Sequence, residues 1–219
     1  MTARVAFVHT VGFLADEFRK LMRAQLPDVD AFHILNESLL QDLLRGTSPA
    51  QVHRRVAEQL MLAADAGASL LVMTCSSTSP GVDVARQMTD LPILKIDDPM
   101  AAQAVRSGRR IGLLCTATST VAPSTALLEA HAAQQGREIQ VRPEVNAAAY
   151  QALFSGDRAT HDRLVRESAT RLAGEVDVLV LAQASLAHLA GPLGEALQCP
   201  VLASPPLLMR ELAQRLASS

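Results

Sequence analysis

Short apolar runs alternate with longer amphipathic stretches along the whole chain. Leu70–Met73 and Val178–Leu181 are entirely apolar, as expected for strands that are buried on both faces of a parallel sheet. Between such runs, apolar residues recur at helical spacing, as in the predicted helix Leu14–Leu26. This alternation is typical of βαβ units and predicts an α/β fold with parallel sheets.

Further strands and helix starts follow from the same pattern. The other strands that we predict are Arg4–Val8, Ala31–Leu35, Pro92–Ile96, Arg110–Leu114, Glu138–Val141 and Pro200–Leu202. A capping residue followed by proline marks the start of a helix, and this pair occurs at Ser48-Pro49, Asp98-Pro99 and Ser204-Pro205. Asp157 is a further predicted cap.

An internal repeat suggests how these units are organised. The segment Arg4–Thr10 resembles Arg110–Thr116, which lies 106 positions later. The segment Leu71–Ser77 resembles Leu179–Ser185, which lies 108 positions later. Parallel strands draw on the same few apolar residues, so chance similarity is the alternative explanation. Because the segments recur in one order at nearly constant spacing, we favour a duplication.

The repeat predicts two lobes related by a pseudo-twofold axis, each a small parallel sheet with helices on both faces, with the active-site cleft between them. The first lobe would contain residues 1–97 and a C-terminal helix of about 205–219, and the second lobe residues 98–204. No linker rich in glycine, serine or proline separates the halves, so we expect the lobes to pack together.

Composition narrows the function classes. The chain has 219 residues, of which 49% are hydrophobic and 19% charged, with a formal net charge of −2. Its basic residues are scattered, which argues against nucleic acid or an anionic membrane as a partner. Three cysteines at unrelated spacings indicate neither a disulfide framework nor a metal knuckle. We therefore expect a cytoplasmic protein.

Polar residues follow the predicted strands where a parallel sheet binds its ligands. Open parallel sheets bind ligands outside the carboxyl ends of their strands. The candidates at these ends are His9, Thr10, Cys75, Ser76, Ser77, Cys115, Thr116, Gln183 and Ser185. Cys199 precedes its strand and so lies at the opposite edge, where we expect a structural residue.

Cys75 has the most reactive side chain among the candidates. It precedes the turn Ser76–Pro80 and a short helix, where backbone amides bind anions and favour the thiolate. A thiolate there would act as a base or nucleophile. The alternative is an inert buried cysteine, which behaves as a small hydrophobic residue.

A hydroxyl-rich loop follows the first strand of the second lobe. Thr116-Ala-Thr-Ser-Thr120 opens a helix, and hydroxyls combined with helix N-terminal amides form a cradle for a carboxylate. Ordinary helix capping is the alternative, but five consecutive small or hydroxyl-bearing positions, four of them with a hydroxyl, exceed what one cap requires. We therefore expect Thr116, Ser119 and Thr120 to bind substrate.

Other polar positions have more ordinary explanations. His9 occupies the matching place in the first lobe, where a hydrogen-bonded structural role competes with proton transfer. Asn36-Glu37-Ser38 either reaches the cleft or caps the next helix. Asp97-Asp98-Pro99 is better explained as a helix start than as a metal site, because no histidine or third carboxylate is spaced to join it.

With these residues in place, the chain resembles the aspartate/glutamate/hydantoin racemase superfamily over essentially its whole length. Leu70–Ser77, Arg110–Thr116 and Val178–Ser185 carry the resemblance. It implies cofactor-independent chemistry on carbon acids next to carboxylates, with one cysteine from each lobe on opposite faces of the substrate carbon. Cys75 matches the first of these cysteines, and the Thr116–Thr120 loop is similar to the family's carboxylate loop.

One departure from the family pattern changes the expected chemistry. Gln183 stands where the family's second cysteine is expected, and a primary amide cannot deliver a proton as an acid. Two-thiol racemisation cannot run through this pair, although Cys115 or His9 could replace the missing partner. Relatives with altered cysteine pairs include a malonate-type decarboxylase, whose cysteine belongs to the second lobe, and a maleate cis-trans isomerase.

These observations predict an enzyme that acts on a small carboxylate without cofactor or metal. Cys75 would be its catalytic thiol, and His9, Thr10, Ser76, Ser77, Thr116, Ser119, Thr120, Gln183 and Ser185 would bind the substrate. Racemisation, isomerisation and decarboxylation remain open. The alternative is a non-catalytic protein that binds or senses small carboxylates. A homodimer is the default assembly for such a protein.

Overall fold

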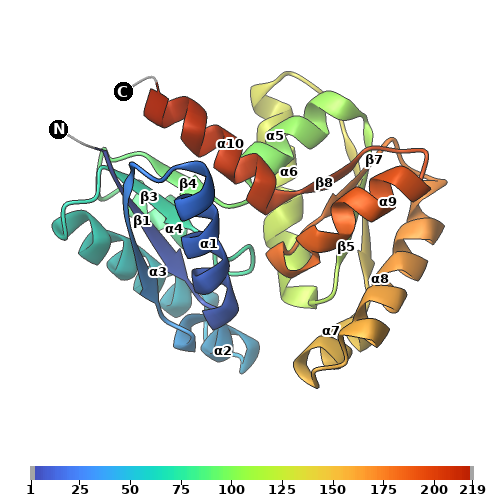
Figure 1. Cartoon of the computed structure of the whole chain (residues 1–219), viewed down its shortest axis with the longest axis horizontal. Helices are drawn as coiled ribbons and strands as arrows, with labels where there is room; N and C mark the ends of the chain where they lie inside the picture. The colour runs from blue at the N-terminus through green and yellow to red at the C-terminus, as the bar shows by residue number, and fades with distance from the viewer. Residues whose placement is uncertain (1–2, 218–219) are drawn as a thin grey trace. The chain divides into compact units, whose positions relative to one another are not determined.

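The computed structural model describes residues 3–217 of the chain. The backbone divides into two compact units (Figure 1). The first unit extends to Ile96 and resumes at Leu208, and the second runs from Asp97 to Leu207. No helix among residues 3–217 is both long and apolar enough to cross a bilayer.

The first unit contains a parallel four-stranded sheet in the order β2-β1-β3-β4. Its strands are β1 (Arg4–His9), β2 (Asp30–Leu35), β3 (Leu70–Met73) and β4 (Ile93–Lys95). Its helices are α1 (Gly12–Gln25), α2 (Ser38–Leu44), α3 (Pro49–Asp65) and α4 (Gly81–Ala85), and most of α10 (Ser204–Ala217) also belongs to it.

The second unit repeats this arrangement with the strand order β6-β5-β7-β8. Its strands are β5 (Arg110–Cys115), β6 (Gln140–Val145), β7 (Val178–Leu181) and β8 (Val201–Ala203). Its helices are α5 (Asp98–Ser107), η1 (Thr118–Thr120), α6 (Val121–Gln134), α7 (Ala147–Phe154), α8 (Arg158–Ala173), η2 (Ala184–Leu189) and α9 (Ala190–Ala196).

The strand register reproduces the internal repeat. Val5 pairs with Leu70 in the first sheet, and Ile111 pairs with Val178 in the second. These pairs are related by the same shifts of 106 and 108 positions that relate the sequence segments. The prediction of two similar α/β lobes with parallel sheets is confirmed.

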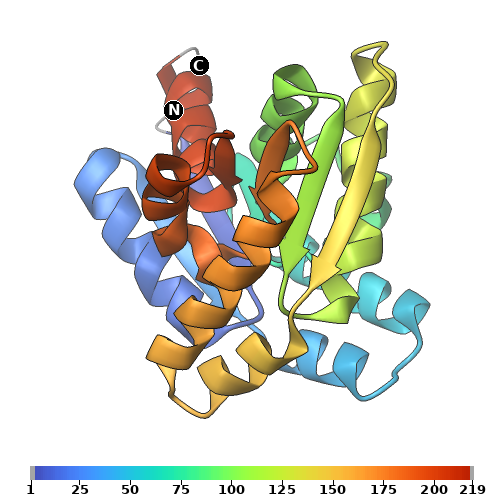
Figure 2. The same cartoon turned by 90° about the vertical axis from the view of Figure 1, so that its right-hand side faces the viewer.

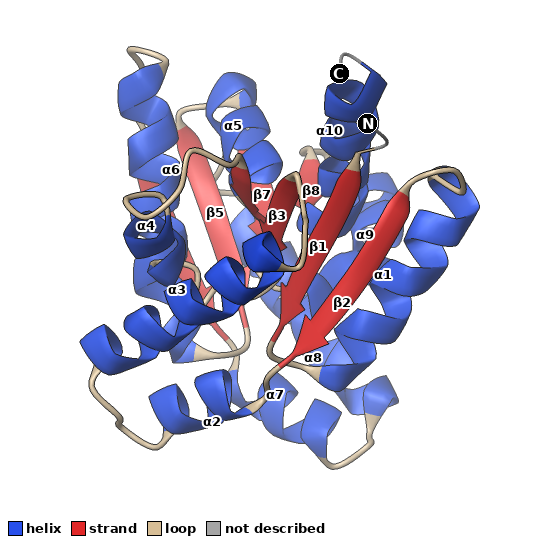
Figure 3. Cartoon of the chain, turned by 90° about the vertical axis from the view of Figure 1, so that its left-hand side faces the viewer, coloured by secondary structure: helices blue, strands red, loops and turns tan. Residues whose placement is uncertain are grey.

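Apolar residues cover both faces of each sheet. In the first unit, Ala6, Val8, Leu71 and Met73 pack with α3 and α4, whereas Phe7 contacts Phe18 of α1 with ring centroids 5.4 Å apart. Figure 3 shows α1 and α3 on opposite faces of β1 and β2.

The sheet of the second unit is covered in the same way (Figure 2). Ile111, Leu113 and Val180 pack with α5 and α6, and Leu114 and Leu179 pack with α8 and α9. Alternation along a strand thus places neighbouring residues in separate core clusters. Both sheets expose their carboxyl ends to the loops that carry the candidate residues.

Most helix starts agree with the sequence predictions. Asp157 caps α8 by accepting a hydrogen bond from the Thr160 amide at 3.0 Å, and α5 begins at Asp98 with proline in its first turn. Ser48 precedes α3 as expected, but its side chain forms no capping hydrogen bond.

One strand prediction is wrong in its boundaries. We expected a strand over Glu138–Val141, but β6 runs from Gln140 to Val145 and includes Pro143. Proline is tolerated because β6 is an edge strand that pairs only with β5. Its largely exposed residues lack the apolar run that identified the inner strands.

Candidate functional site at the strand ends

In the first unit, the candidate residues lie at the carboxyl ends of the adjacent strands β1 and β3. Val8 and Met73 are register partners at these ends, and the Thr74 amide donates to the Val8 carbonyl at 3.0 Å. The pairing places His9 and Thr10 beside Thr74 and Cys75. The sheet thus brings the two predicted segments of this unit together.

Cys75 lies at the margin of the α3-side core, with 9% of its surface exposed. The turn that follows it is polar and yet buried, since Ser76, Ser77, Thr78 and Ser79 are each at most 9% exposed. Backbone hydrogen bonds from Ser79 to Ser76 and from Gly81 to Thr78 close this turn. The thiol therefore lies beside a constrained run of amides and hydroxyls.

Gly81 brings this turn onto α3. A Cβ at position 81 would lie 2.6 Å from the Val56 Cβ and 2.9 Å from the His53 carbonyl oxygen. No side chain fits at that separation, so only glycine allows α4 to begin so close to α3. This close approach fixes the position of the segment between Cys75 and α4.

His9 is part of a directed chain of hydrogen bonds. Thr74 Oγ1 donates to the Val8 carbonyl at 3.0 Å, so it must accept from His9 Nδ1, which lies 2.8 Å away. His9 Nε2 then has the lone pair of the neutral ring, and it accepts from His33 Nδ1 at 2.9 Å. Each ring is thereby assigned one tautomer.

Burial keeps both imidazoles neutral. Desolvation, followed by the charges of His33 and Arg19, lowers the pKa of His9 to about 3. Desolvation and the Arg19 charge lower the pKa of His33 to about 4. His9 is fully buried with both ring nitrogens engaged, so at neutral pH it orients Thr74 and has no proton to donate as an imidazolium.

Two hydroxyls near Cys75 have unused hydrogen-bonding capacity. Thr10 Oγ1 and Thr78 Oγ1 are buried and form no hydrogen bond within the part of the chain that the structure describes. Such orphaned groups are rare in native structures.

In the second unit, Gln183 and Thr116 contact each other directly. Gln183 Oε1 accepts from the Thr116 amide at 2.5 Å and from Thr116 Oγ1 at 2.9 Å. Thr116 is 1% exposed, so its two donors are satisfied inside the protein. The fold thus brings two predicted site residues together. Their contact uses the amide and hydroxyl donors of Thr116 and the amide oxygen of Gln183.

The remaining predicted residues of this unit flank that pair. Ser119 and Thr120 belong to the single turn η1, which leads into α6, and Thr120 is buried. Ser185 lies in η2 after Gln183, and its carbonyl accepts from His188 Nδ1 at 3.1 Å.

The other two cysteines are poor proton donors or acceptors. Cys115 is fully buried, and desolvation together with the Glu144 charge raises its pKa to about 12. Burial also raises the pKa of Cys199, which immediately precedes the Pro200 that leads into β8. Both thiols therefore stay protonated at neutral pH.

Comparison of the two units locates the asymmetry of the site. Thr10 corresponds to Thr116 and Cys75 to Gln183, by the shifts that relate the strands. In the second unit this pair is joined by two hydrogen bonds. In the first unit the Thr10 hydroxyl has no hydrogen-bond partner within residues 3–217, and a cysteine stands at the position that corresponds to Gln183.

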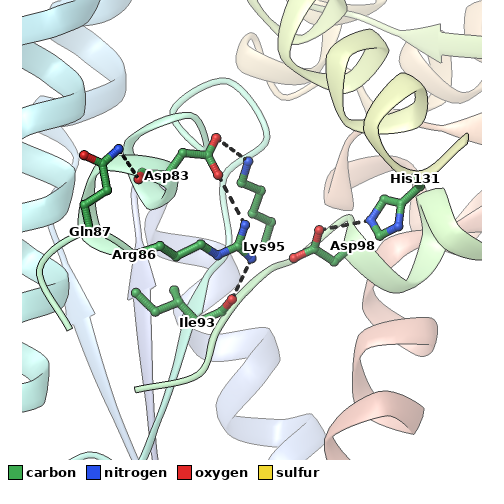
Figure 4. A network of polar contacts seen from close by, with 7 residues as sticks. All are labelled: Asp83, Arg86, Gln87, Ile93, Lys95, Asp98 and His131. Atoms are coloured by element: carbon green, nitrogen blue, oxygen red, sulfur yellow. Dashed lines mark hydrogen bonds and ion pairs between the residues drawn. The ribbon is translucent and has the colours of Figure 1, made fainter. Parts of the chain in front are cut away.

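Charged side chains elsewhere form compact pairs (Figure 4). In the first unit, Asp83 accepts from Lys95 at 2.8 Å and from Arg86 at 3.2 Å, which ties α4 to the end of β4. In the second unit, His131 Nε2 lies 3.2 Å from Asp98 Oδ1. These contacts connect elements of one unit and involve no residue of the strand-end clusters.

Sequence reasoning missed Thr74, Thr78 and His33. Thr74 and Thr78 flank segments that were singled out, so their hydroxyls were a usable signal. His33 lies inside a predicted strand, and only the pairing of β1 with β2, in which Phe7 and His33 are register partners, places it next to His9.

Comparison with known proteins agrees with this architecture. A model of the Asp/Glu/hydantoin racemase family matches residues 13–212. A glutamate racemase of Rippkaea orientalis is 28% identical over 180 residues, which make up 78% of this chain and 60% of that protein. The chain thus spans about 60% of the length of this relative.

Solved structures share the fold. Glutamate racemase RacE1 from Bacillus anthracis superposes with a TM-score of 0.76 at 17% identity, covering 99% of this chain and 82% of that one. Allantoin racemase from Klebsiella pneumoniae gives 0.71 at 17% identity, with 99% and 88% covered.

Proposed function

We propose, on the premise that this chain belongs to the Asp/Glu/hydantoin racemase family, that it is a cofactor-independent enzyme acting on a small carboxylic acid. Its reaction takes place at the carbon next to the carboxylate, and Cys75 is its only proton-transferring thiol. The observation that carries this proposal is an asymmetry between corresponding pairs. Gln183 is bound to Thr116, whereas the matching pair consists of Cys75 and a Thr10 hydroxyl with no partner among the described residues.

We assign acid–base chemistry to Cys75 by excluding the other candidate groups, on the premise of family membership. Gln183 does not ionise in the working range. Cys115, with a pKa of about 12, and His9, with a pKa of about 3, keep one protonation state at neutral pH. Cys75 is thus the group that we assign to take a proton from, or return it to, the substrate carbon.

The binding part of the proposal uses groups that can stabilise negative charge. Proton removal beside a carboxylate, or loss of carbon dioxide from a malonate-type acid, forms an enediolate-like anion that is costly unless donors are preorganised for it. We assign this role to Thr10, Ser76 and Ser77 in the first unit. Thr116, Ser119, Thr120, Gln183 and Ser185 are the proposed binding residues of the second unit.

A single thiol limits the reaction to one face of the carbon. In decarboxylation the C–C bond breaks, its electron pair forms the enediolate, and the Cys75 thiol protonates the carbon before water restores the proton on sulfur. In exchange, the thiolate removes a proton and returns one from the same side. In cis-trans isomerisation, the thiolate would add to one carbon of the double bond, whose electron pair moves to the enediolate; rotation about the C–C bond and departure of the thiolate would then restore the double bond. Racemisation needs a second proton donor on the opposite face, so we favour stereospecific single-base chemistry.

A second candidate function follows from the contact between Gln183 and Thr116. If these groups serve only to close the carboxylate loop, the chain is a protein that binds a small carboxylate without transforming it. Incubation with aspartate, glutamate, methylmalonate and maleate in D2O, followed by NMR, separates the two functions. We expect α-deuteration or consumption of an acid, whereas thermal stabilisation by an acid that remains unchanged would favour the binder.

A further inference from the structure

A cluster of three side chains in the second unit lies outside the strand-end site. His161 and Asp162 come from the first turns of α8, and His188 comes from η2. Their potential ligand atoms all lie within 4.8 Å of one another. His161 Nδ1 is 2.7 Å and His188 Nε2 is 2.8 Å from the same atom, Asp162 Oδ1.

The hydrogen bonds of His188 leave the lone pair of its Nε2 available to bind a cation. Its Nδ1 must donate to the Ser185 carbonyl at 3.1 Å, since a carbonyl oxygen only accepts. A neutral ring with this tautomer points the lone pair of Nε2 at Asp162 Oδ1, which is repulsive unless a proton or a metal ion lies between them. A ligating histidine whose other nitrogen donates to a backbone carbonyl is the usual outer shell of a metal site.

His161 contacts the same carboxylate from the protein interior. The residue is fully buried, and its Nε2 has no hydrogen-bond partner among the residues that the structure places. Its only polar contact is thus at Nδ1, on the side of Asp162. Nδ1 is therefore the ring atom of His161 that can ligate an ion bound to Asp162.

The cluster is also accessible. The side chains of Asp162 and His188 are 25% and 31% exposed, so an ion can enter from solvent and complete its coordination with water. The neighbouring Arg163 pairs with Glu167 at 2.8 Å, which offsets its charge.

We propose that His161, Asp162 and His188 form a binding site for a divalent transition-metal ion, with Zn²⁺ as its representative. Two imidazoles and one carboxylate are a ligand set suited to Zn²⁺ and its neighbours and not to Mg²⁺ or Ca²⁺, which prefer all-oxygen sites. Tetrahedral ligands at Zn–N and Zn–O lengths lie about 3.3 Å apart, so with an ion bound each ring nitrogen would lie slightly farther from Asp162 Oδ1 than the present 2.7 Å and 2.8 Å.

Such an ion would tie η2 to α8. Because η2 follows Gln183 directly, occupancy would fix the segment that includes Ser185 and His188. The three ligands themselves take no part in the proposed proton transfer.

Isothermal titration of the EDTA-treated chain with ZnCl2 tests the site. We expect one saturable Zn²⁺ per chain, with affinity at least about tenfold lower in His188→Gln and in Asp162→Asn. His131→Gln is the matched control, because it also removes one imidazole of an Asp–His pair in the same unit and retains all three cysteines. It should bind as the unmodified chain does.

A second readout separates binding from damage to the fold. Zn²⁺ should raise the thermal unfolding midpoint of the unmodified chain and of His131→Gln, and at the same concentration should raise that of His188→Gln less. His188 is at the surface, so its replacement should preserve the far-UV circular dichroism spectrum. Absence of saturable binding, or equal affinity in His188→Gln and the unmodified chain, would overturn the proposal.

Discussion

Gln183 Oε1 accepts two hydrogen bonds from Thr116, one from its amide at 2.5 Å and one from its hydroxyl at 2.9 Å. The two residues follow β7 and β5, which are neighbours in the sheet. The contact holds the start of the hydroxyl-rich loop against the end of β7. It also uses an acceptor where the resemblance to the family implied a second thiol.

Removal of the acceptor should destabilise the chain. In Gln183→Ala, the buried Thr116 amide loses its partner, and we expect unfolding to cost about 1–3 kcal/mol less. Gln183→Glu keeps an oxygen in the same place and should lose less stability. Urea denaturation of the three proteins measures the difference, and equal midpoints for Gln183→Ala and the unmodified chain would contradict this account of the contact.

Replacement by a thiol should change the stereochemical outcome. Gln183→Cys releases both donors of Thr116 and supplies a second group that can carry a proton. We expect this variant to gain racemisation of an acid that the unmodified chain exchanges or produces on one face only. Chiral chromatography of the product measures this gain, and a product of unchanged single configuration would argue against opposed proton donors.

The buried imidazole of His9 and the half-buried imidazole of His33 should make the fold sensitive to mild acid. The folded-state pKa values of His9 and His33 are about 3 and about 4, below the ordinary value of 6.5. As pH falls through 6.5, the unfolded chain therefore binds protons that the folded chain does not. Their contribution to stability is complete above pH 6.5 and is lost progressively as pH falls toward 4.

His33→Phe tests this dependence. The variant removes one of the two imidazoles and keeps an aromatic ring against Phe7, so the fall of the denaturation midpoint between pH 6.5 and pH 4.5 should become shallower. The variant will also be less stable at pH 7, because His9 Nε2 loses its donor. An unchanged slope would show that His33 is not held neutral by the fold.

The Asp177 carboxylate, which binds Arg110 at the start of β5, should produce a separate loss of stability at lower pH. Asp177 accepts from the Arg110 guanidinium and from the Arg109 and Arg110 amides. Hydrogen bonds from Arg110 lower its pKa to about 2. A lowered carboxyl pKa gives stability that is present above about pH 4 and lost as pH falls toward 2.

Asp177→Asn measures that contribution. The variant should be less stable than the unmodified chain at pH 7, and the difference should shrink between pH 4 and pH 2. Asp28→Asn removes an exposed carboxylate elsewhere and serves as the control. A difference that stays constant with pH would contradict the assignment.

The fold was largely predictable from the sequence because its signals are local. Leu70–Met73 and Val178–Leu181 are strands within the predicted boundaries, since only inner strands of a parallel sheet bury four consecutive apolar residues. The edge strand β6 was misplaced because Arg142 and Pro143 are exposed and Glu144 pairs with Arg171 of α8, so this segment gives no apolar run.

The site was only partly predictable because its contacts join distant segments. Residue type indicated that Gln183 can only hydrogen-bond, but its bond to Thr116 depends on the pairing of β5 with β7. In the same way, His161, Asp162 and His188 have no metal-binding spacing in the sequence. The fold of α8 beside η2 brings them together.

The central claim is that Cys75 transfers the proton. Its most direct test compares Cys75→Ser with Cys199→Ser in D2O, using an acid that the unmodified chain deuterates or consumes and following it by NMR. The account predicts that Cys75→Ser retains the folded spectrum and loses at least about a hundredfold in rate, while Cys199→Ser keeps its activity. Full turnover by Cys75→Ser would contradict it.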